Sequence, residues 1–234
     1  MIKKFFITGT SSGIGLALAQ MLLDSGHVVV GIARRNAISH KNYHHNTLDL
    51  ADIEEVEKFT FKVNHDFEEL ILVNNAGWIG EVKPVGKLKD QNIARLNNIN
   101  ITAPSILMNR FLDQTENSGI ERTIVNVSSG AAKSTIRSWA GYCASKAAID
   151  MFSRVIKEEH PDVNVYSIAP GVVDTEMQRD IREVDAKDFA DVDRFRSMKA
   201  EGELKSSEDV ARVFVDLLEN KEKTLGTVFS LRDL

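Results

Sequence analysis

Tyr142 and Lys146 lie four residues apart in a segment that reads as a helix, and together they could carry proton-transfer chemistry. Positions i and i+4 share one face of a helix, so the phenol and the ammonium group would meet. A tyrosine has a pKa near ~10 in water and is a poor acid at neutral pH. A nearby lysine charge favours the phenolate, so we expect Lys146 to lower the pKa of Tyr142. The pair alone is weak evidence, because many helices carry this spacing on a solvated face.

A glycine-rich segment, TGTSSGIG at residues 8–15, offers a place for a phosphate group. It follows a strand-like segment and opens a helix, whose N-terminus presents free N–H groups. The spacing is G-x-x-x-G-x-G, which differs from the commonest dinucleotide fingerprint. A plain strand-to-helix connection is the alternative, but the place in the first strand–helix unit favours cofactor binding. The residues expected at the pyrophosphate are Gly9, Ser11, Ser12, Gly13, Ile14 and Gly15.

The end of the second predicted strand favours NADPH over NADH. An acidic residue at this point would bind the ribose hydroxyl groups. The chain instead continues from Ala33 into Arg34 and Arg35, and a guanidinium group pairs bidentately with a 2′-phosphate. Two solvated loop arginines are the alternative reading of the same residues.

Alternating strands and helices must position these groups. Predicted strands cover residues 3–8, 27–33, a short stretch ending near 48, 70–74, 123–128, 163–169 and 227–231, and predicted helices cover 14–24, 53–63, 89–98, 103–114, 142–160 and 208–219. This order predicts a Rossmann-type, doubly wound parallel sheet in a three-layer α/β domain that spans residues 1–234. Residues 172–205 lack a clear pattern and are too long for a plain connection, so we expect a lid or a substrate loop there.

The composition is typical of a soluble globular protein. The 234 residues are 43% hydrophobic and 27% charged, and the net charge of -5 argues against a nucleic-acid surface. No apolar stretch approaches the ~20 residues that cross a bilayer, and we expect no signal peptide. The single cysteine excludes an internal disulfide and suggests the cytoplasm. The six histidines (27, 40, 44, 45, 65 and 160) lack metal-ligand spacing, so we expect no metal.

Taken together, these motifs resemble the short-chain dehydrogenases/reductases over essentially the whole chain. The marks that match are residues 8–15, the run 74–77 (NNAG), Asn100, Ser129 with Tyr142 and Lys146, and the pair 170–171 (PG). A narrower resemblance links segments 128–133, 139–143, 150–152, 170–178 and 202–204 to the sepiapterin reductase branch, and within it to bacterial enzymes similar to benzil reductase ((S)-benzoin forming). One departure is Ser230, which stands where sepiapterin reductases carry a pterin-anchoring aspartate.

The resemblance implies a carbonyl reductase that transfers hydride from NADPH to an aromatic ketone or a vicinal diketone. Tyr142 would be the general acid, and Lys146 would lower its pKa and hold the nicotinamide ribose. Ser129 would orient and polarise the carbonyl group, and Asn100 would support a proton-relay water. Separately, Ser129 could merely cap a strand end and Asn100 could be a turn or helix-cap residue.

The resemblance also assigns the remaining contacts. Asp49 and Leu50 would lie near the adenine, and Asn75, Ala76 and Gly77 near its ribose. The nicotinamide would lie between Pro170, Gly171, Val173 and Thr175. Trp139 and Met177 are the substrate candidates, while Trp78, Phe189, Phe195 and Met198 could equally be core residues. Cys143 is expected to turn away from the site as a small buried hydrophobe.

Several other functions stay open at this point. A sepiapterin or pteridine reductase and an NAD(P)-dependent alcohol dehydrogenase are the enzymatic alternatives. A non-enzymatic NADP-sensing regulatory protein is a further one, although it could dispense with Tyr142 and Lys146, which this chain keeps. The resemblance also implies a homodimer or homotetramer that assembles through residues 103–114 and 142–160.

Overall fold

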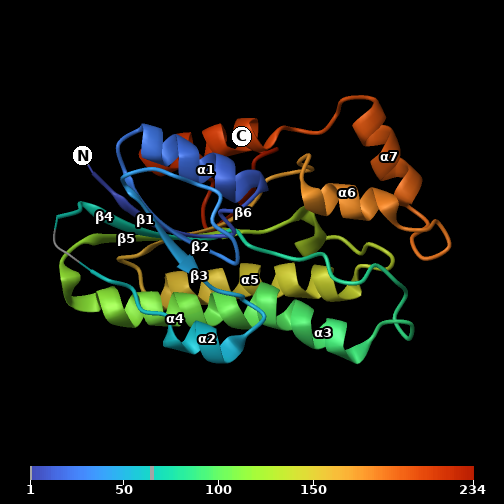
Figure 1. Ribbon diagram of the computed structural model, residues 1–234, viewed down its shortest axis with the longest axis horizontal. Helices are drawn as coiled ribbons and strands as arrows, with labels where there is room; N and C mark the ends of the chain where they lie inside the picture. Colours follow the sequence, from blue (N-terminus) through green and yellow to red (C-terminus); the bar gives the residue numbers. More distant parts are fainter. Residues whose placement is uncertain (1, 64–65) are drawn as a thin grey trace.

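The computed structural model describes residues 2–63 and 66–234, and the strands of this part form one parallel sheet (Figure 1). The strands are β1 (Lys4–Thr8), β2 (Val28–Ala33), β3 (Tyr43–Thr47), β4 (Glu69–Asn74), β5 (Glu121–Val127), β6 (Asn164–Ala169) and β7 (Val228–Ser230). Their order is β3-β2-β1-β4-β5-β6-β7, and each neighbouring pair is parallel. The chain leaves β1 in one direction and later returns to add β4 on its other side. This confirms the predicted doubly wound sheet, with its crevice at the switch point.

Helices cover both faces of the sheet, which gives the three predicted layers (Figure 1). One face is covered by α1 (Gly13–Asp24) and α8 (Ser207–Glu219), and the other by α2 (Ile53–Lys58), α4 (Ala103–Thr115) and α5 (Ala140–Glu159). Successive residues of β1 serve opposite faces: Phe5 and Ile7 pack under α1 and α8, and Phe6 packs with Phe111 of α4. Burial on both faces explains why the central strands are continuous apolar runs.

The second helix is shorter than predicted. It ends at Lys58 rather than at residue 63, because the chain is extended at Phe59. Phe59 and Phe61 then pack edge to face at 5.0 Å, and the backbone N–H of Phe61 donates to Gln114 Oε1 at 2.7 Å. Tertiary packing therefore overrides a helical sequence pattern at this point.

The predicted helices 89–98 and 103–114 form a single rod. The helix α3 (Asp90–Asn97) continues through a π-helical turn (Asn98–Thr102) directly into α4. Such a turn inserts extra backbone into a helix and is frequent at functional sites. Short 3-10 turns also occur at Glu116–Ser118, Gly130–Ala132 and Lys221–Lys223.

About half of the segment 172–205 is helical, although its sequence shows no clear pattern, and its role as a lid or substrate loop stays a prediction. The segment contains α6 (Glu176–Glu183) and α7 (Val192–Ala200), which lie together at one end of the molecule (Figure 1). Thr175 caps α6 by accepting a hydrogen bond from the N–H of Gln178. The two ends of the segment meet at a β-bridge between Val173 and Lys205. The helices form because Phe189 and its apolar neighbours are buried against the body of the protein, a contact that local sequence does not reveal.

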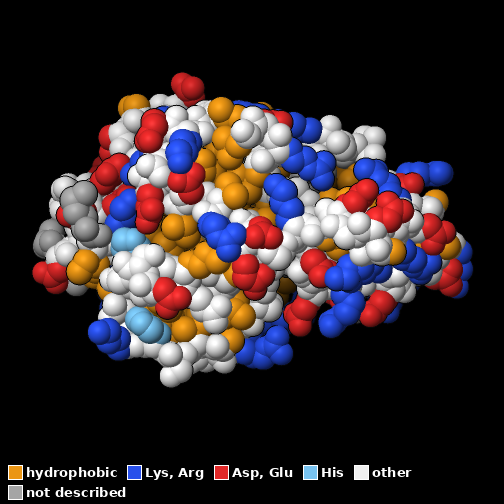
Figure 2. All heavy atoms as spheres, turned by 90° about the horizontal axis from the view of Figure 1, so that it is seen from above, with side chains coloured by type: hydrophobic (Ala, Val, Ile, Leu, Met, Phe, Trp, Pro, Cys, Tyr) orange, Lys and Arg blue, Asp and Glu red, His pale blue; other side chains and the backbone are white. Residues whose placement is uncertain are grey.

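Basic and acidic side chains are interspersed on the face shown in Figure 2. In the described part of the chain, no helix is long and apolar enough to cross a membrane. Residues 2–63 and 66–234 also hold no group of three or more His, Cys, Asp or Glu side chains that could bind a metal ion. His65 lies outside these residues.

Candidate active site

A cavity of about 940 Å³ opens where the strands end at their carboxyl edge. This is the position at which doubly wound sheets bind ligands, and the volume suits a large molecule. The sequence-predicted residues on its wall are Gly9, Ser11, Ser12, Gly13, Ile14, Arg34, Arg35, Asp49, Leu50, Asn75, Ala76, Gly77, Ser129, Trp139, Tyr142, Lys146, Pro170, Gly171, Val173, Thr175 and Met177. The structure therefore brings nearly all predicted site residues to one place.

The glycine-rich turn, which follows β1, forms one wall of the cavity. Gly9 and Gly13 have φ angles of 76° and 59°, in the left-handed region that favours glycine. A Cβ atom at Gly9 would lie 2.9 Å from Asn75 Nδ2, so a side chain there would also collide with the next loop. No side chain caps the N-terminus of α1 by a hydrogen bond. Its free N–H groups thus face the cavity and can bind a phosphate.

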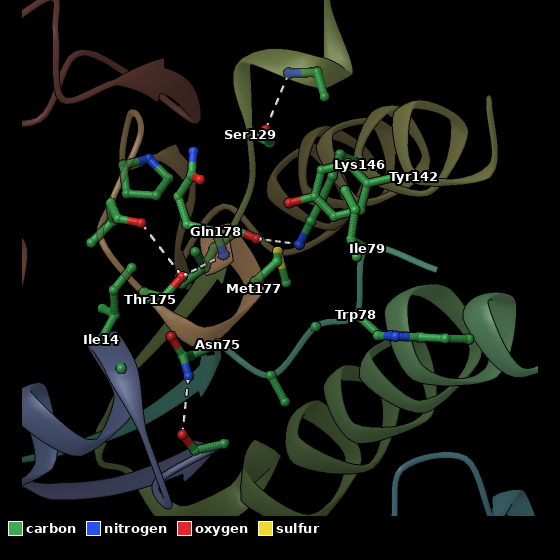
Figure 3. A pocket seen from close by; sticks show the side chains of 18 of the residues that line it. Ile14, Asn75, Trp78, Ile79, Ser129, Tyr142, Lys146, Thr175, Met177 and Gln178 are labelled. Atoms are coloured by element: carbon green, nitrogen blue, oxygen red, sulfur yellow. Dashed lines mark hydrogen bonds between the residues drawn. The ribbon is translucent and has the colours of Figure 1, made fainter. Parts of the chain in front are cut away.

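Gly15 and Asn75 hold this turn from behind. A Cβ atom at Gly15 would lie 2.4 Å from both Asn75 Nδ2 and the Gly9 carbonyl oxygen. Gly15 does not line the cavity, so the structure gives it a packing role rather than the predicted cofactor contact. Asn75 lines the cavity and donates from Nδ2 to the Thr8 carbonyl at 2.9 Å (Figure 3).

Arg34 and Arg35 lie at the cavity wall directly after β2, as predicted. Both side chains are exposed, and neither forms a hydrogen bond or ion pair with another residue in the described part of the chain. Asp49, the predicted adenine contact, also lines the cavity and lies 3.9 Å from Arg95 in an exposed ion pair. Two uncommitted guanidinium groups are therefore available to an anionic group here.

The catalytic candidates converge from two elements on the opposite wall (Figure 3). Tyr142 and Lys146 occupy successive turns of α5, and Ser129 follows β5. Lys146 Nζ lies 5.6 Å from the centroid of the Tyr142 ring and donates to the Val127 carbonyl at 2.8 Å. Ser129 Oγ accepts a hydrogen bond from the N–H of Ala131, so it also caps the short turn after β5.

Burial controls the protonation of the tyrosine–lysine pair. It raises the pKa of Tyr142 to about 12, and a hydrogen bond with Ser129 acts weakly in the opposite direction. The net pKa of Tyr142 therefore lies above its usual value, and the predicted effect of Lys146 on it stays a prediction. Burial also lowers the pKa of Lys146 itself from 10.5 to about 8, against the attraction of the Asp150 carboxylate. At neutral pH the phenol keeps its proton and can act as an acid.

Asn100 has a positioning role in the structure. It is buried in the π-helical turn and does not line the cavity. Its Oδ1 accepts from the N–H of Trp78 at 2.9 Å, and its Nδ2 donates to the Trp78 carbonyl at 2.8 Å and to Ser145 Oγ at 3.1 Å. The amide thereby ties the loop after β4 to the helix that carries Tyr142.

An aromatic cluster closes the far end of the cavity. The Trp139 ring stacks on Phe189 at 5.5 Å, lies 5.3 Å from Phe195 and meets Tyr142 edge-on at 5.7 Å. Trp139, Phe195, Met177, Met198 and Trp78 line the cavity, whereas Phe189 is completely buried core. Cys143 is half-buried against this cluster but is absent from the cavity wall, in partial agreement with the expectation.

The wall also carries polar residues that were not predicted as site residues, among them Gln178, Arg194 and Arg232. Asp150 behind the wall was not predicted either, and it accepts hydrogen bonds from Ser128 Oγ at 2.6 Å and Ser167 Oγ at 2.7 Å. The i+4 spacing from Lys146 could have indicated Asp150. Gln178 belongs to the segment 170–178 that carries the family resemblance, but the sequence did not indicate that its side chain lines the cavity.

Comparisons with known proteins agree with this geometry. Residues 3–186 match the model of the short chain dehydrogenase family. A benzil reductase ((S)-benzoin forming) from Bacillus subtilis (strain 168) is 35% identical over 99% of this chain and 99% of that protein. A sepiapterin reductase from Rattus norvegicus is 32% identical over 97% and 95% of the two chains. A solved short chain dehydrogenase/reductase from Saccharomyces cerevisiae superimposes with a TM-score of 0.84 at 26% identity, covering 97% of this chain and 95% of that one.

Proposed function

Because this chain belongs to the short chain dehydrogenase family, we propose that it is an NADPH-dependent carbonyl reductase for an aromatic ketone or a vicinal diketone of the benzil type. The observation that carries the proposal is the shared cavity, in which Ser129, Tyr142 and Lys146 face a glycine-rich turn and two uncommitted arginines. The similarity to a benzil reductase over the whole chain supports the substrate class.

The residues present fit a dinucleotide. The free N-terminus of α1 would bind the pyrophosphate, and Arg34 with Arg35 would bind a 2′-phosphate. Lys146 would hold the nicotinamide ribose, and Thr175, beside the α1 N-terminus, would lie near the nicotinamide. The further contacts are those predicted from the sequence at Asp49, Leu50, Asn75, Ala76, Gly77, Pro170, Gly171 and Val173. When bound, the reduced cofactor supplies the hydride.

The protein itself supplies position and a proton. Ser129 Oγ would donate a hydrogen bond to the substrate carbonyl oxygen and orient it. Tyr142 would transfer its proton to the same oxygen as negative charge develops there. The Lys146 ammonium, 5.6 Å from the ring centroid, would then stabilise the phenolate that remains. Asn100 would hold the loop after β4 in place through its hydrogen bond with Trp78, and it would support a water molecule near Lys146.

The far end of the cavity favours aryl groups. Trp139, Met177 and Phe195 offer an apolar surface on which a phenyl ring can stack. Ser230 also lines the cavity, where its hydroxyl accepts from the N–H of Arg232 at 3.2 Å. A serine cannot form the ionic bond that an aspartate would give a pterin, so we rank a benzil-type substrate above sepiapterin.

Three alternatives are weaker. Sepiapterin or pteridine reduction is supported by the 32% identity to a sepiapterin reductase but opposed by Ser230. Oxidation of an alcohol would need the phenolate of Tyr142, whose pKa of about 12 disfavours that form at neutral pH. A non-catalytic NADP sensor would have no use for the complete set of Ser129, Tyr142 and Lys146.

Assembly and location are also part of the proposal. Met151, Phe152 and Val155 on α5 expose 56%, 40% and 46% of their surface, which supports a homodimer or homotetramer packed through this helix. A cytoplasmic location is supported by the single cysteine.

Turnover of a substrate panel tests the proposed function. Purified protein would be mixed with NADPH or NADH and benzil, an aromatic monoketone or sepiapterin, and the loss of reduced cofactor would be followed by absorbance. Benzil turnover with NADPH is the expected result. Preferential turnover of sepiapterin would show that Ser230 was given too much weight, and cofactor binding without turnover of any carbonyl would favour the sensor.

A further inference from the structure

Gln178 presents a hydrogen-bond donor that has no partner in the described part of the chain. Its side chain is 3% exposed and lines the cavity, yet Nε2 forms no hydrogen bond. Buried polar groups of native proteins are nearly always paired, because an unpaired one loses its bonds to water without compensation. An unpaired donor on the wall of an active site therefore indicates a group that arrives with the ligand.

The amide of Gln178 is held in a fixed orientation. Its Oε1 accepts a hydrogen bond from Arg182 Nη1 at 2.9 Å, one helical turn further along α6. Because a guanidinium group can only donate, this bond identifies the oxygen and leaves Nε2 as the free end. In Figure 3, Gln178 and Thr175 lie across the pocket from the Tyr142 ring.

A second donor supports the same interpretation. Trp139 Nε1 is likewise buried without a partner, and this residue lines the same cavity. The surrounding surface is apolar and aromatic. The pocket thus has space for aryl groups. Ser129 and Tyr142 already supply the donors for one ketone oxygen, so the N–H groups of Gln178 and Trp139 remain for another acceptor.

We propose that Gln178 binds the second, non-reacting carbonyl oxygen of a vicinal dicarbonyl substrate through Nε2 and thereby selects diketones over monoketones. This inference rests on the proposed function and specifies its substrate. In a 1,2-diketone with its two C=O bonds pointing in opposite directions, one oxygen faces Tyr142 and Ser129 while the other faces the opposite wall. That wall carries Gln178, and Trp139 Nε1 offers a further donor to substrate oxygen.

A site built to hydrogen-bond a substrate group discriminates strongly against analogues that lack the group, because its own donor is then left unpaired. The test compares benzil with deoxybenzoin, in which a CH2 group replaces one carbonyl while both phenyl rings remain. Wild type and two variants would be compared by kcat/KM. Gln178→Met removes the donor without adding charge, and Gln178→Glu keeps an acceptor for Arg182 while replacing the NH2 group.

In both variants we expect kcat/KM for benzil to fall by about 10- to 100-fold, while that for deoxybenzoin changes less than about threefold. Met177→Leu is the packing control, and it should change both substrates by a similar factor. Titration of each variant with NADPH confirms that it is folded and binds cofactor. Since two substitutions are used, failure of one to fold leaves the other as the test.

An equal fall for benzil and deoxybenzoin would overturn the inference while leaving carbonyl reduction intact. A weaker NADPH affinity with equal losses for both ketones would also overturn it and assign the donor to the cofactor carboxamide. Failure of wild type to reduce either ketone would instead overturn the proposed function, and this inference with it.

Discussion

Replacing Lys146 with methionine should stabilise the protein at neutral pH while it abolishes catalysis. Lys146 is 6% exposed, and burial lowers its pKa from 10.5 to about 8. At 1.36 kcal/mol per pKa unit, keeping the charged side chain buried at pH 7 costs about 3 kcal/mol. The hydrogen bond from Nζ to the Val127 carbonyl at 2.8 Å returns about 1 kcal/mol. The variant should therefore gain about 2 kcal/mol, which raises Tm by about 4–8 °C in a chain of this size.

The stability gained by the Lys146→Met variant should become smaller as the pH rises. Below pH 8 both the folded and the unfolded chain carry the proton on Lys146, so the wild type is destabilised by the full free energy of burying the charged ammonium group. Between pH 8 and pH 10.5 the unfolded chain keeps the proton and the folded chain releases it, so wild-type stability rises with pH. The advantage of the methionine variant should thus shrink by about 2 kcal/mol between about pH 7 and pH 9.5. The Tyr142 phenol, with a pKa of about 12, stays protonated in this range.

Urea unfolding followed by circular dichroism at these two pH values measures the effect. Lys157→Met is the matched control on the same helix, because Lys157 Nζ also donates to backbone carbonyls, of Pro161 and Val163, but the residue is only half-buried. The control should lose stability at both pH values. A Lys146→Met variant that is less stable than wild type at neutral pH, or an advantage that does not change with pH, would refute the reasoning.

Three other substitutions test separate parts of the account. Arg34→Asp should weaken NADPH binding by about tenfold or more and spare NADH, and an equal effect on both cofactors in a fluorescence titration would contradict the 2′-phosphate assignment. Gly31→Ala should cost about 1–3 kcal/mol of stability in urea unfolding, because its Cβ would lie 2.0 Å from Tyr43 Oη and 2.6 Å from Thr10 Oγ1; an unchanged free energy of unfolding would contradict this packing. Phe152→Asp should dissociate the proposed oligomer in sedimentation velocity, whereas an unchanged mass would move the interface elsewhere.

The sheet could be predicted because its signals are local. Apolar runs that end in turn residues marked the central strands, and the glycines of residues 8–15 marked the place of the first crossover. The shared cavity followed, since the carboxyl ends of parallel strands meet at one edge. Ser129, Tyr142 and Lys146 come from two elements, and the resemblance to the short-chain dehydrogenases/reductases predicted that they share one site.

Features that depend on packing between distant segments could not be predicted. The α6–α7 segment is stabilised by burial of Phe189 and Phe195 against Trp139, which lies far away in the sequence. The pKa of Tyr142 is raised mainly by burial, which the i+4 spacing of the lysine could not indicate. Gln178 became significant only when its amide was seen to be buried on the cavity wall without a partner for Nε2.

The central claim is that Tyr142 delivers the proton to a carbonyl substrate. The most direct test compares wild type with Tyr142→Phe for NADPH affinity and for NADPH consumption in the presence of benzil. We predict that affinity for NADPH is retained and that kcat falls by about 100-fold or more. Turnover of the phenylalanine variant at the wild-type rate would contradict the claim.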